Sequence, residues 1–260
     1  MSLLQVKNLI VEFPSRHGTL RALDEISFEI APGEILGVVG ESGAGKSLTG
    51  ASIIGLLEPP GRVAGGEILL QGQRIDPSPH QFSGGMRQRV VIALALAAEP
   101  QLIVADEPTT ALDVSIQAQI ISLLKNVCQK HGAAVMLITH DMGVIAETCD
   151  RVAVMYAGRI VEVGPVHQVI NHPEHPYTAG LMASIPDMEV DRERLNQIDG
   201  AMPRLNAIPK GCAFNPRCPQ AFDRCRQERP DLSPVNTFDP TVQTHVACWL
   251  QNETKLEVVR

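Results

Sequence analysis

The sequence predicts an α/β fold: a mostly parallel sheet wrapped by helices, with an N-terminal antiparallel β part and a small C-terminal extension. Three observations carry this prediction. Apolar runs and helical patterns alternate between residues 35 and 139, as in parallel strands joined by helices. A glycine-rich loop links one such strand to a helix. From residue 165 onward proline becomes frequent and long periodic patterns stop, which indicates a compact extension with few elements of its own.

The individual elements follow from periodicity and turn signals. Alternating apolar and polar residues, or short continuous apolar runs, mark strands, whereas apolar residues at helical spacing mark helices. The expected strands are residues 3–13, 23–30, 35–39, 67–70, 102–105, 133–139, 151–155 and 159–163, the last two forming a hairpin. The expected helices are residues 48–57, 86–98 and the stretch between Asp113 and Gly132, with a turn at 14–18 and a loop at 61–66.

Composition narrows the function. The 260 residues carry a net charge of −7 and no basic run, which argues against nucleic-acid binding, because phosphate backbones are recognised by clustered Lys and Arg. The longest apolar run, residues 90–98, is too short to cross a bilayer, and the N-terminus lacks the features of a signal peptide. We therefore expect a cytoplasmic protein that meets a membrane only through a partner.

Residues 40–47 match the phosphate-binding loop G-x-x-x-x-G-K-[ST]. Glycines let successive backbone N–H groups converge on one anion, and the following helix N-terminus favours negative charge. Lys46 is expected to reach the β- and γ-phosphates, and Ser47 to ligate Mg²⁺. The predicted nucleotide-binding residues of this loop are Gly40, Glu41, Ser42, Gly43, Ala44, Gly45, Lys46 and Ser47.

Charged side chains follow two of the buried strands. Residues 102–105 lead into Asp106 and Glu107, and residues 133–139 lead into His140. Carboxyl ends of parallel strands share one edge of a sheet, where ligands gather. We expect Asp106 to hold Mg²⁺ with Ser47, Glu107 to polarise the attacking water, and His140 to sense the γ-phosphate.

Four cysteines, Cys212, Cys218, Cys225 and Cys248, crowd the last fifth of the chain. In a cytoplasmic protein such a group indicates metal more than disulfide. Cys128 and Cys149 stand alone and are expected to be buried thiols.

The order of these motifs resembles that of the ATP-binding subunit of ABC transporters: a phosphate loop, then Ser83-Gly84-Gly85, then Asp106-Glu107, then Asp113, then His140. The resemblance covers roughly residues 3–185. It implies that Ser83, Gly84 and Gly85 are the signature that closes on ATP held by a second ATPase subunit. It further implies two membrane permeases and an extracytoplasmic binding protein as partners, at the cytoplasmic face of the inner membrane.

Two stretches resemble the bacterial importers of oligopeptides, dipeptides and nickel: residues 79–89 and residues 175–186. Peptide import is thus the expected function, with nickel, glutathione or an oligosaccharide as alternative substrates. Some members of this branch hold an iron–sulfur cluster in C-terminal cysteines, so the resemblance implies a [4Fe–4S] site at the four cysteines. Zinc or unligated thiols are the alternatives, although zinc sites usually show tighter C-x2-C pairs. The branch also implies an aromatic wall for adenine, placed at His17 or Phe13.

One departure from the family is plain. Gly72 is followed by Ser83 after a short proline-rich linker, so the glutamine loop and most of the helical subdomain are absent. We accordingly expect an ABC nucleotide-binding domain at residues 1–164, largely lacking its helical subdomain, and a C-terminal extension at 165–260. Two rival hypotheses remain: a coupling-deficient remnant that binds nucleotide or a partner ATPase, and a soluble ABC ATPase acting on ribosomes or DNA, which the missing basic patches disfavour.

Overall fold

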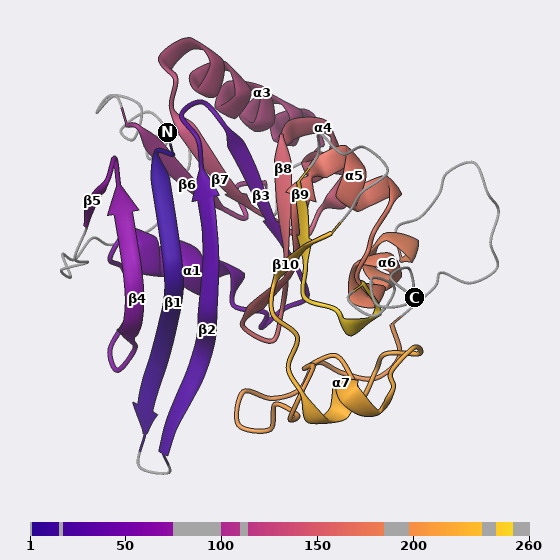
Figure 1. Cartoon of the computed structure of the whole chain (residues 1–260). Helices are drawn as coiled ribbons and strands as arrows, with labels where there is room; N and C mark the ends of the chain where they lie inside the picture. The colour runs from indigo at the N-terminus through magenta and orange to yellow at the C-terminus, as the bar shows by residue number, and fades with distance from the viewer. Residues whose placement is uncertain are drawn as a thin grey trace.

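The computed structural model describes residues 2–15, 18–74, 100–109, 114–184, 198–235 and 243–251. Its strands form two sheets (Figure 1). The described strands are β1 Leu4–Ser15, β2 Gly18–Ile30, β3 Ile35–Val39, β4 Arg62–Leu70, β5 Gln73–Arg74, β6 Leu102–Asp106, β7 Ala134–Ile138, β8 Arg151–Tyr156, β9 Arg159–Pro165, β10 Ser233–Val235 and β11 Thr244–Val246. The described helices are α1 Lys46–Ile53, α3 Val114–His131, α4 Met142–Thr148, α5 Val166–Asn171, α6 Pro176–Ala183 and α7 Asp223–Gln227.

The first sheet is antiparallel, with the order β2-β1-β4-β5. It confirms the predicted N-terminal β part but corrects its boundaries, because β2 begins at Gly18 and β4 includes residues expected to be a loop. The reason is a bulge: the β1–β4 register shifts between Lys7 and Ile10, and Gly66 takes a φ of 89° directly against the Asn8 carbonyl. Glycines that serve a bulge look like loop residues in a sequence.

The second sheet has the order β10-β11-β9-β8-β3-β7-β6. Strands β8, β3, β7 and β6 run parallel, as predicted, whereas β9 pairs with β8 as the expected hairpin and is antiparallel. Strand β11 of the C-terminal part adds to β9, so the extension lengthens the same sheet. Parallel order brings the carboxyl ends of β3, β6 and β7 to one edge, which is where the site forms.

Side chains on the two faces of the second sheet fill two cores. Along β7, Met136 and Ile138 point into a core shared with α1 and the first sheet, while Val135 and Leu137 pack toward α3 and α4. The helices accordingly lie on both sides of the sheet, with α1 between the two sheets (Figure 1). Helix α1 ends at Ile53 and not at residue 57 as expected, because Gly55 leaves the helix with a φ of 72°.

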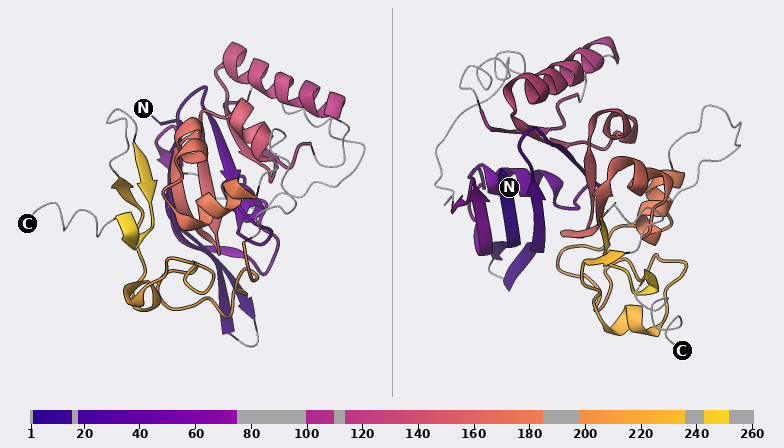
Figure 2. Two further views of the ribbon diagram at one scale, coloured as in Figure 1. Left: turned by 90° about the vertical axis from the view of Figure 1, so that its right-hand side faces the viewer. Right: turned by 45° about the horizontal axis from the view of Figure 1, so that its top comes forward.

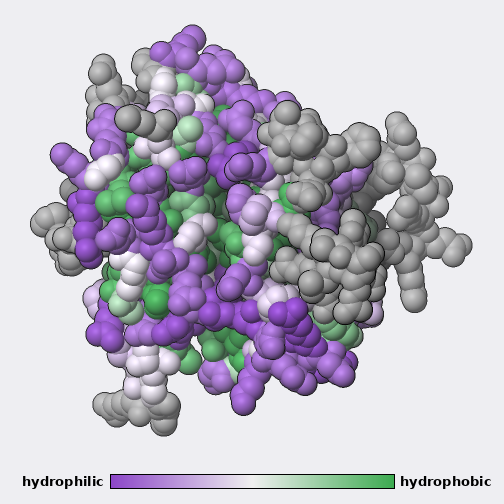
Figure 3. Space-filling view, viewed as in Figure 1, coloured by the Kyte–Doolittle hydropathy of each residue, from purple (hydrophilic) through white to green (hydrophobic). Residues whose placement is uncertain are grey.

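The C-terminal part around α7 lies below α6 and beside the second sheet (Figure 2). An aromatic cluster fixes it there: Phe214 packs against Tyr156 and Tyr177, with ring centroids 5.3 and 5.4 Å apart. Buried aromatic pairs of this geometry add about 0.5–1.5 kcal/mol beyond their buried area. The face viewed in Figure 3 is mostly hydrophilic, with apolar side chains in small separate patches. Within the described residues, no helix has the length and apolar character needed to cross a bilayer.

Candidate functional site

The loop between β3 and α1 has the conformation that its glycines permit. Gly40 takes a φ of 149°, and a Cβ atom there would meet the Met155 carbonyl oxygen at 2.3 Å. Gly45 takes a φ of 99° where the loop enters α1, and a Cβ atom there would meet the Leu23 side chain at 2.6 Å. Both positions therefore require glycine, for its conformational freedom and for its lack of a side chain.

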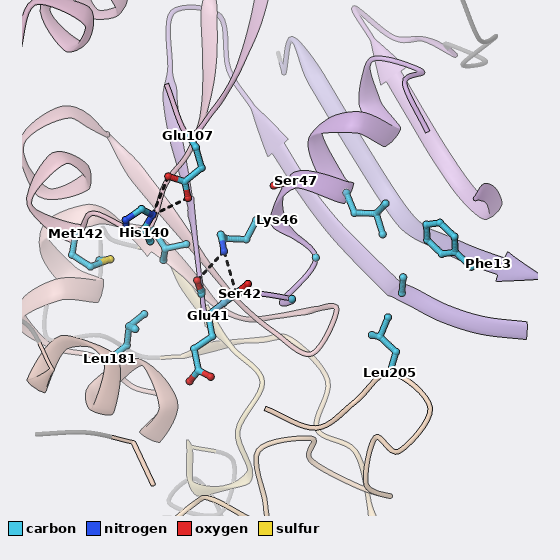
Figure 4. A pocket seen from close by; sticks show the side chains of 16 residues that line it. Phe13, Glu41, Ser42, Lys46, Ser47, Glu107, His140, Met142, Leu181 and Leu205 are labelled. Carbon is cyan, nitrogen blue, oxygen red and sulfur yellow. Dashed lines mark hydrogen bonds and ion pairs between the residues drawn. The ribbon is translucent and has the colours of Figure 1, made fainter. Parts of the chain in front are cut away.

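Lys46 is the positive charge inside this loop. Its Nζ donates to the carbonyl oxygens of Gly40 at 2.9 Å and Glu41 at 3.1 Å (Figure 4). Burial lowers the pKa of Lys46 below its ordinary value, although the carboxylates of Glu107 and Asp106 act in the opposite direction. A half-buried ammonium that is held only by neutral carbonyls gains strongly from an anionic ligand.

The predicted magnesium pair is assembled. Ser47 Oγ, in the first turn of α1, donates to Asp106 Oδ1 at 3.1 Å, where β6 ends. A hydroxyl and a carboxylate at this separation are oxygen donors of the kind that Mg²⁺ takes while keeping several waters. The neighbouring carboxylate of Glu107 lies instead against His140.

Glu107 and His140 form the second polar pair of the site. His140 Nδ1 lies 2.9 Å from the Glu107 carboxylate (Figure 4). Glu107 has a positive φ of 47°, which is uncommon for a residue other than glycine, and its N–H donates to the Ile138 carbonyl at 2.8 Å. Such a turn directly after a strand aims the carboxylate at the sheet edge, and backbone strain of this kind is frequent at functional sites.

The residue after His140 fixes its position. Asp141 caps α4 by accepting hydrogen bonds from the N–H groups of Gly143 and Val144, at 2.9 and 3.1 Å. Its own N–H donates to Thr139 Oγ1 at 3.1 Å. His140 is thus held between a strand end and a capped helix start, which orients its ring toward Glu107.

These groups surround a cavity of about 640 Å³, within the range of small-molecule sites. Residues of the phosphate loop form a large part of its wall, with Glu107 and His140 at one end. Apolar side chains complete it: Phe13 from β1, Met142 from α4, Leu181 from α6 and Leu205 from the C-terminal part (Figure 4). Met142 and Leu181 lie on the side of His140, whereas Phe13 and Leu205 lie on the opposite side of Lys46 (Figure 4). An apolar surface on that side suits a ligand that joins phosphates to a ring.

The sequence-derived candidates divide into three groups. The phosphate loop, Glu107 and His140 come together at this cavity, and Asp106 is hydrogen-bonded to Ser47 of the loop. Ala44 is the one loop residue that does not line the cavity, since it is fully buried. Phe13, one candidate for the adenine wall, lines the cavity. His17, Ser83, Gly84, Gly85 and Asp113 lie outside the described residues.

Sequence reasoning missed the contribution of the C-terminal part. Tyr177 Oη accepts a hydrogen bond from the Glu41 N–H at 3.0 Å, and Arg217 binds the Glu41 carboxylate at 3.1 and 3.2 Å. Leu205 lines the cavity directly. Tyr177 belongs to the stretch 175–186 that resembles the peptide importers, but no local pattern indicated that it, Arg217 or Leu205 contacts a loop more than a hundred positions away.

The four C-terminal cysteines line one small pocket, together with His175 and Trp249. Burial, together with a smaller contribution from the neighbouring thiols, raises the pKa of Cys212 to about 11 and that of Cys248 to about 12. His175 is fully buried; its Nδ1 accepts from the Tyr177 N–H, while its Nε2 has no hydrogen-bond partner. Among the described residues, no three such side chains stand arranged as metal ligands. The four thiols share one pocket, but they are not arranged around a common point where a metal ion could bind.

A P-loop between a parallel strand and a helix, with strand-end carboxylates facing it, defines the chain as a nucleotide-binding cassette. The ABC transporter family model matches residues 23–79 and 70–110. The model of the oligopeptide/dipeptide transporter C-terminal region matches residues 161–225. The structure resembles cbiO1 from Clostridium perfringens, part of the ABC transporter complex cbiONQ (24% identity, TM-score 0.55, covering 66% of this chain and 92% of that chain). It also resembles a nucleotide-free ATP-binding cassette from an ABC transporter (17% identity, TM-score 0.58, covering 70% and 98%).

Relatives with described functions are more similar in sequence. The chain is 38% identical to the dipeptide transport ATP-binding protein DppD of Escherichia coli K12, covering 90% of this chain and 93% of the relative. It is 38% identical to the oligopeptide transport ATP-binding protein OppD of Haemophilus influenzae, covering 96% and 98%. The chain therefore belongs to the family of ABC ATP-binding proteins of the dipeptide/oligopeptide type. The alignment with the first relative spans 305 positions, more than the 260 residues here, so the relatives contain residues that this chain lacks.

Proposed function

We propose that this protein binds and hydrolyses ATP as the energy-coupling subunit of an ABC importer of peptides. The observation that carries the proposal is the arrangement of Lys46, Ser47 and the Glu107–His140 pair around one cavity, with Asp106 hydrogen-bonded to Ser47. Family membership supports the class of reaction, and the dipeptide and oligopeptide transport proteins among the relatives support the substrate.

Each residue has a role that follows from its position. The loop N–H groups bind phosphate oxygens, and Lys46 exchanges its carbonyl partners for the β- and γ-phosphates. Ser47 and Asp106 would hold Mg²⁺, which when bound neutralises charge on the phosphates. Glu107 accepts a proton from the attacking water, and His140 orients Glu107 and contacts the terminal phosphate. Phe13 and Leu205 provide an apolar surface for the nucleobase.

The partners follow from the same proposal. A second ATPase subunit would supply its signature to this loop and receive Ser83, Gly84 and Gly85 in return. Two membrane permeases and an extracytoplasmic binding protein would complete the importer, with this subunit peripheral at the cytoplasmic face of the inner membrane.

A hydrolysis assay tests the core of the proposal. Purified protein should release phosphate from ATP in the presence of Mg²⁺, and Lys46→Ala should lose nucleotide binding. Lys125→Ala is the matched control, because Lys125 pairs with Glu147 on a distant exposed surface. Wild-type protein that neither binds nor hydrolyses ATP would refute the proposal.

The short connection between Gly72 and Ser83 supports one alternative function. In this alternative the chain is a remnant that binds nucleotide or a partner ATPase without driving transport. The family match falls into two pieces that meet at this connection, residues 23–79 and 70–110. Peptide uptake in cells that carry this chain as the sole copy of the subunit separates the two. Restored uptake supports the importer, whereas ATP binding without uptake supports the remnant.

For the cysteine pocket we propose a [4Fe–4S] cluster held by Cys212, Cys218, Cys225 and Cys248. Four thiols in one pocket match the donor set that such a cluster requires. The unpartnered Nε2 of His175 in the same pocket is an orphaned buried donor that a cluster sulfur would satisfy. Zinc is the alternative occupant, and free thiols are the second alternative.

Metal content and absorption distinguish these states. Protein purified under anaerobic conditions should contain about four iron atoms per chain. It should also show a broad absorption band in the violet to blue part of the visible spectrum. Cys225→Ser should lose both signals, while Cys128→Ser, at an isolated buried thiol, should keep them. Stoichiometric zinc, or no metal with four titratable thiols, would each overturn the cluster assignment.

A further inference from the structure

We infer that Arg217 is a positioning residue for nucleotide binding: it fixes the phosphate loop through the Glu41 carboxylate, so that the C-terminal part is a working component of the nucleotide site. This inference rests on the proposed function of the loop. It assigns a role to a residue that lies 176 positions along the chain from its partner.

The guanidinium of Arg217 spans two parts of the molecule. Its Nη1 donates to both carboxylate oxygens of Glu41, at 3.1 and 3.2 Å. On the other side, its Nε donates to the Asp199 carbonyl at 2.8 Å and its Nη2 to the Ile198 carbonyl at 3.1 Å. The planar, rigid donor set of arginine makes all these bonds at once, which a lysine cannot do.

This ion pair is sheltered from water. The Arg217 side chain is 7% exposed and that of Glu41 is 29% exposed. Tyr156 and Phe214 flank the guanidinium, with both ring centroids 5.9 Å from Cζ. A charge pair this buried is expensive to break, because one unpaired charge would remain out of solvent. The contact is therefore unlike an exposed surface pair of small energetic value.

Glu41 is held at three points. Tyr177 binds its N–H, Lys46 binds its carbonyl oxygen, and Arg217 binds its carboxylate. When Lys46 turns toward the phosphates of a nucleotide, the carbonyl loses its partner. Arg217 and Tyr177 then remain as the bonds that keep Glu41, and with it the first half of the loop, in place.

Charge gives Arg217 a second effect in the same direction. Glu41 places a carboxylate in a loop that is built to receive a polyanion. Arg217 neutralises that carboxylate and draws it away from Glu107 and His140 toward the C-terminal part (Figure 4). Without Arg217 the carboxylate would be free to swing toward the phosphates and oppose their binding.

Other contacts from the same segment reach the site independently. The Met202 side chain lies against Gly43, since a Cβ atom there would meet Met202 Cε at 2.9 Å, and Leu205 lines the cavity. Besides Tyr177 and Leu181 of α6, three residues that follow α6 thus touch the loop or its cavity: Met202, Leu205 and Arg217. An appended segment with a separate function would need none of these contacts.

Equilibrium titration of the full chain with a fluorescent ATP analogue tests the inference. Arg217→Ala should raise the dissociation constant on the order of tenfold, which corresponds to about 1.4 kcal/mol. Arg229→Ala is the matched control, because Arg229 also anchors the C-terminal part, but to Asp24 and Glu25 of β2 and not to the loop. The control should bind the analogue as the wild type does.

A double-mutant cycle of nucleotide affinity distinguishes a role through Glu41 from a purely structural role of Arg217. If Arg217 acts through Glu41, the double variant Glu41→Gln/Arg217→Ala should bind no more weakly than Arg217→Ala alone. Additive losses, or wild-type affinity in Arg217→Ala, would overturn the inference. Should Arg217→Ala not fold, Arg217→Lys takes its place, because it keeps the charge but cannot bridge Glu41, Asp199 and Ile198 together.

The failure of this inference is distinguishable from failure of the proposed function. A wild-type chain and Lys46→Ala that both fail to bind the analogue would refute nucleotide binding itself. Normal binding by the wild type and by Arg217→Ala, with binding lost in Lys46→Ala, would refute only the role of Arg217.

Discussion

His140 Nδ1 lies 2.9 Å from the carboxylate of Glu107, and the two residues follow β7 and β6, which are adjacent parallel strands. The pairing register places Asp106 opposite Ile138, so Glu107, one residue past Asp106, and His140, two residues past Ile138, leave the sheet at the same edge. A carboxylate held by an imidazole at a sheet edge is oriented before any ligand arrives. The first prediction follows from this pair.

Glu107→Gln should slow ATP hydrolysis by roughly 10²–10⁴-fold, the usual contribution of a general base. The amide keeps the size of the side chain and can still bond His140, but it cannot take a proton from water. Nucleotide affinity should therefore stay close to that of the wild type. Phosphate release under saturating ATP measures the first effect, and titration of a fluorescent analogue measures the second.

Glu147→Gln is the control for this substitution, because its side chain is 81% exposed on α4 and lies far from the cavity lining. It should leave hydrolysis unchanged. A Glu107→Gln protein that hydrolyses ATP at the wild-type rate would remove Glu107 from the mechanism and leave His140 without its proposed partner.

The Ser47–Asp106 contact predicts a change in magnesium requirement. Ser47→Ala removes one of the two oxygen donors, so half-maximal hydrolysis should need several-fold more Mg²⁺, with a smaller change in the affinity for metal-free nucleotide. Hydrolysis measured across a Mg²⁺ titration reports this shift. Ser122→Ala, on the exposed side of α3, is the control. An unchanged Mg²⁺ dependence in Ser47→Ala would count against this metal site.

Phe13 and His17 are rival candidates for the adenine wall, and the cavity lining supports Phe13. Phe13→Ala should weaken binding of ATP by about tenfold, since stacking on an aromatic ring contributes on the order of 1 kcal/mol. Binding of inorganic tripolyphosphate should not change, because that ligand has no ring. Competition of both ligands against a fluorescent analogue provides the comparison.

His17→Ala completes that experiment. If His17 is the aromatic wall, its variant will lose ATP affinity selectively and Phe13→Ala will not. Equal weakening of ATP and tripolyphosphate by Phe13→Ala would show instead that the substitution disturbs the surrounding structure, where Phe13 also packs against Gly61.

The sequence predicted those parts of the site that depend on local pattern. A loop with glycines at fixed spacing, and carboxylates directly after a buried strand, need only their immediate neighbours to be recognised. Arg217 and Tyr177 could not be found in this way, because tertiary packing of the C-terminal part brings them to Glu41. Their roles depend on the aromatic cluster around Phe214 and not on a motif.

The fold shows the same division. Strands β6 and β7 were evident from continuous apolar runs: every residue of β7 is buried, and the four apolar residues of β6 are half-buried. The start of β4 was not evident from the sequence, because the glycines of this bulged strand are required by its partner strand. Gly66 is needed because Asn8 on β1 approaches it closely. The end of α1 was also missed by four residues, since apolar residues continue past the glycine that ends the helix.

Asp24, on β2 of the first sheet, forms ion pairs that connect this sheet to the C-terminal part. Its carboxylate accepts from Arg159 at 2.9 Å, from Arg229 at 2.6 Å and from Arg21 at 3.0 Å. Burial raises the pKa of Asp24, but the three guanidinium groups outweigh it, and the pKa lies below its usual 3.8. Asp24→Asn should lower the free energy of unfolding on the order of 1 kcal/mol at pH 7.

The pH dependence of that loss has a definite sign. A carboxyl whose pKa is depressed in the folded state stabilises the fold fully above its unfolded pKa of 3.8, and the stabilisation disappears as the pH falls through the folded pKa. The difference between wild type and Asp24→Asn should thus be constant from pH 7 to about 5 and shrink below about 4. Urea unfolding at a series of pH values measures it. Asp223→Asn is the control, because Asp223 is 90% exposed and pairs only with Arg226 in its own helix turn among the contacts described, so its effect should be near zero throughout. A difference that grows toward acid pH would show that burial, and not the arginine contacts, governs Asp24.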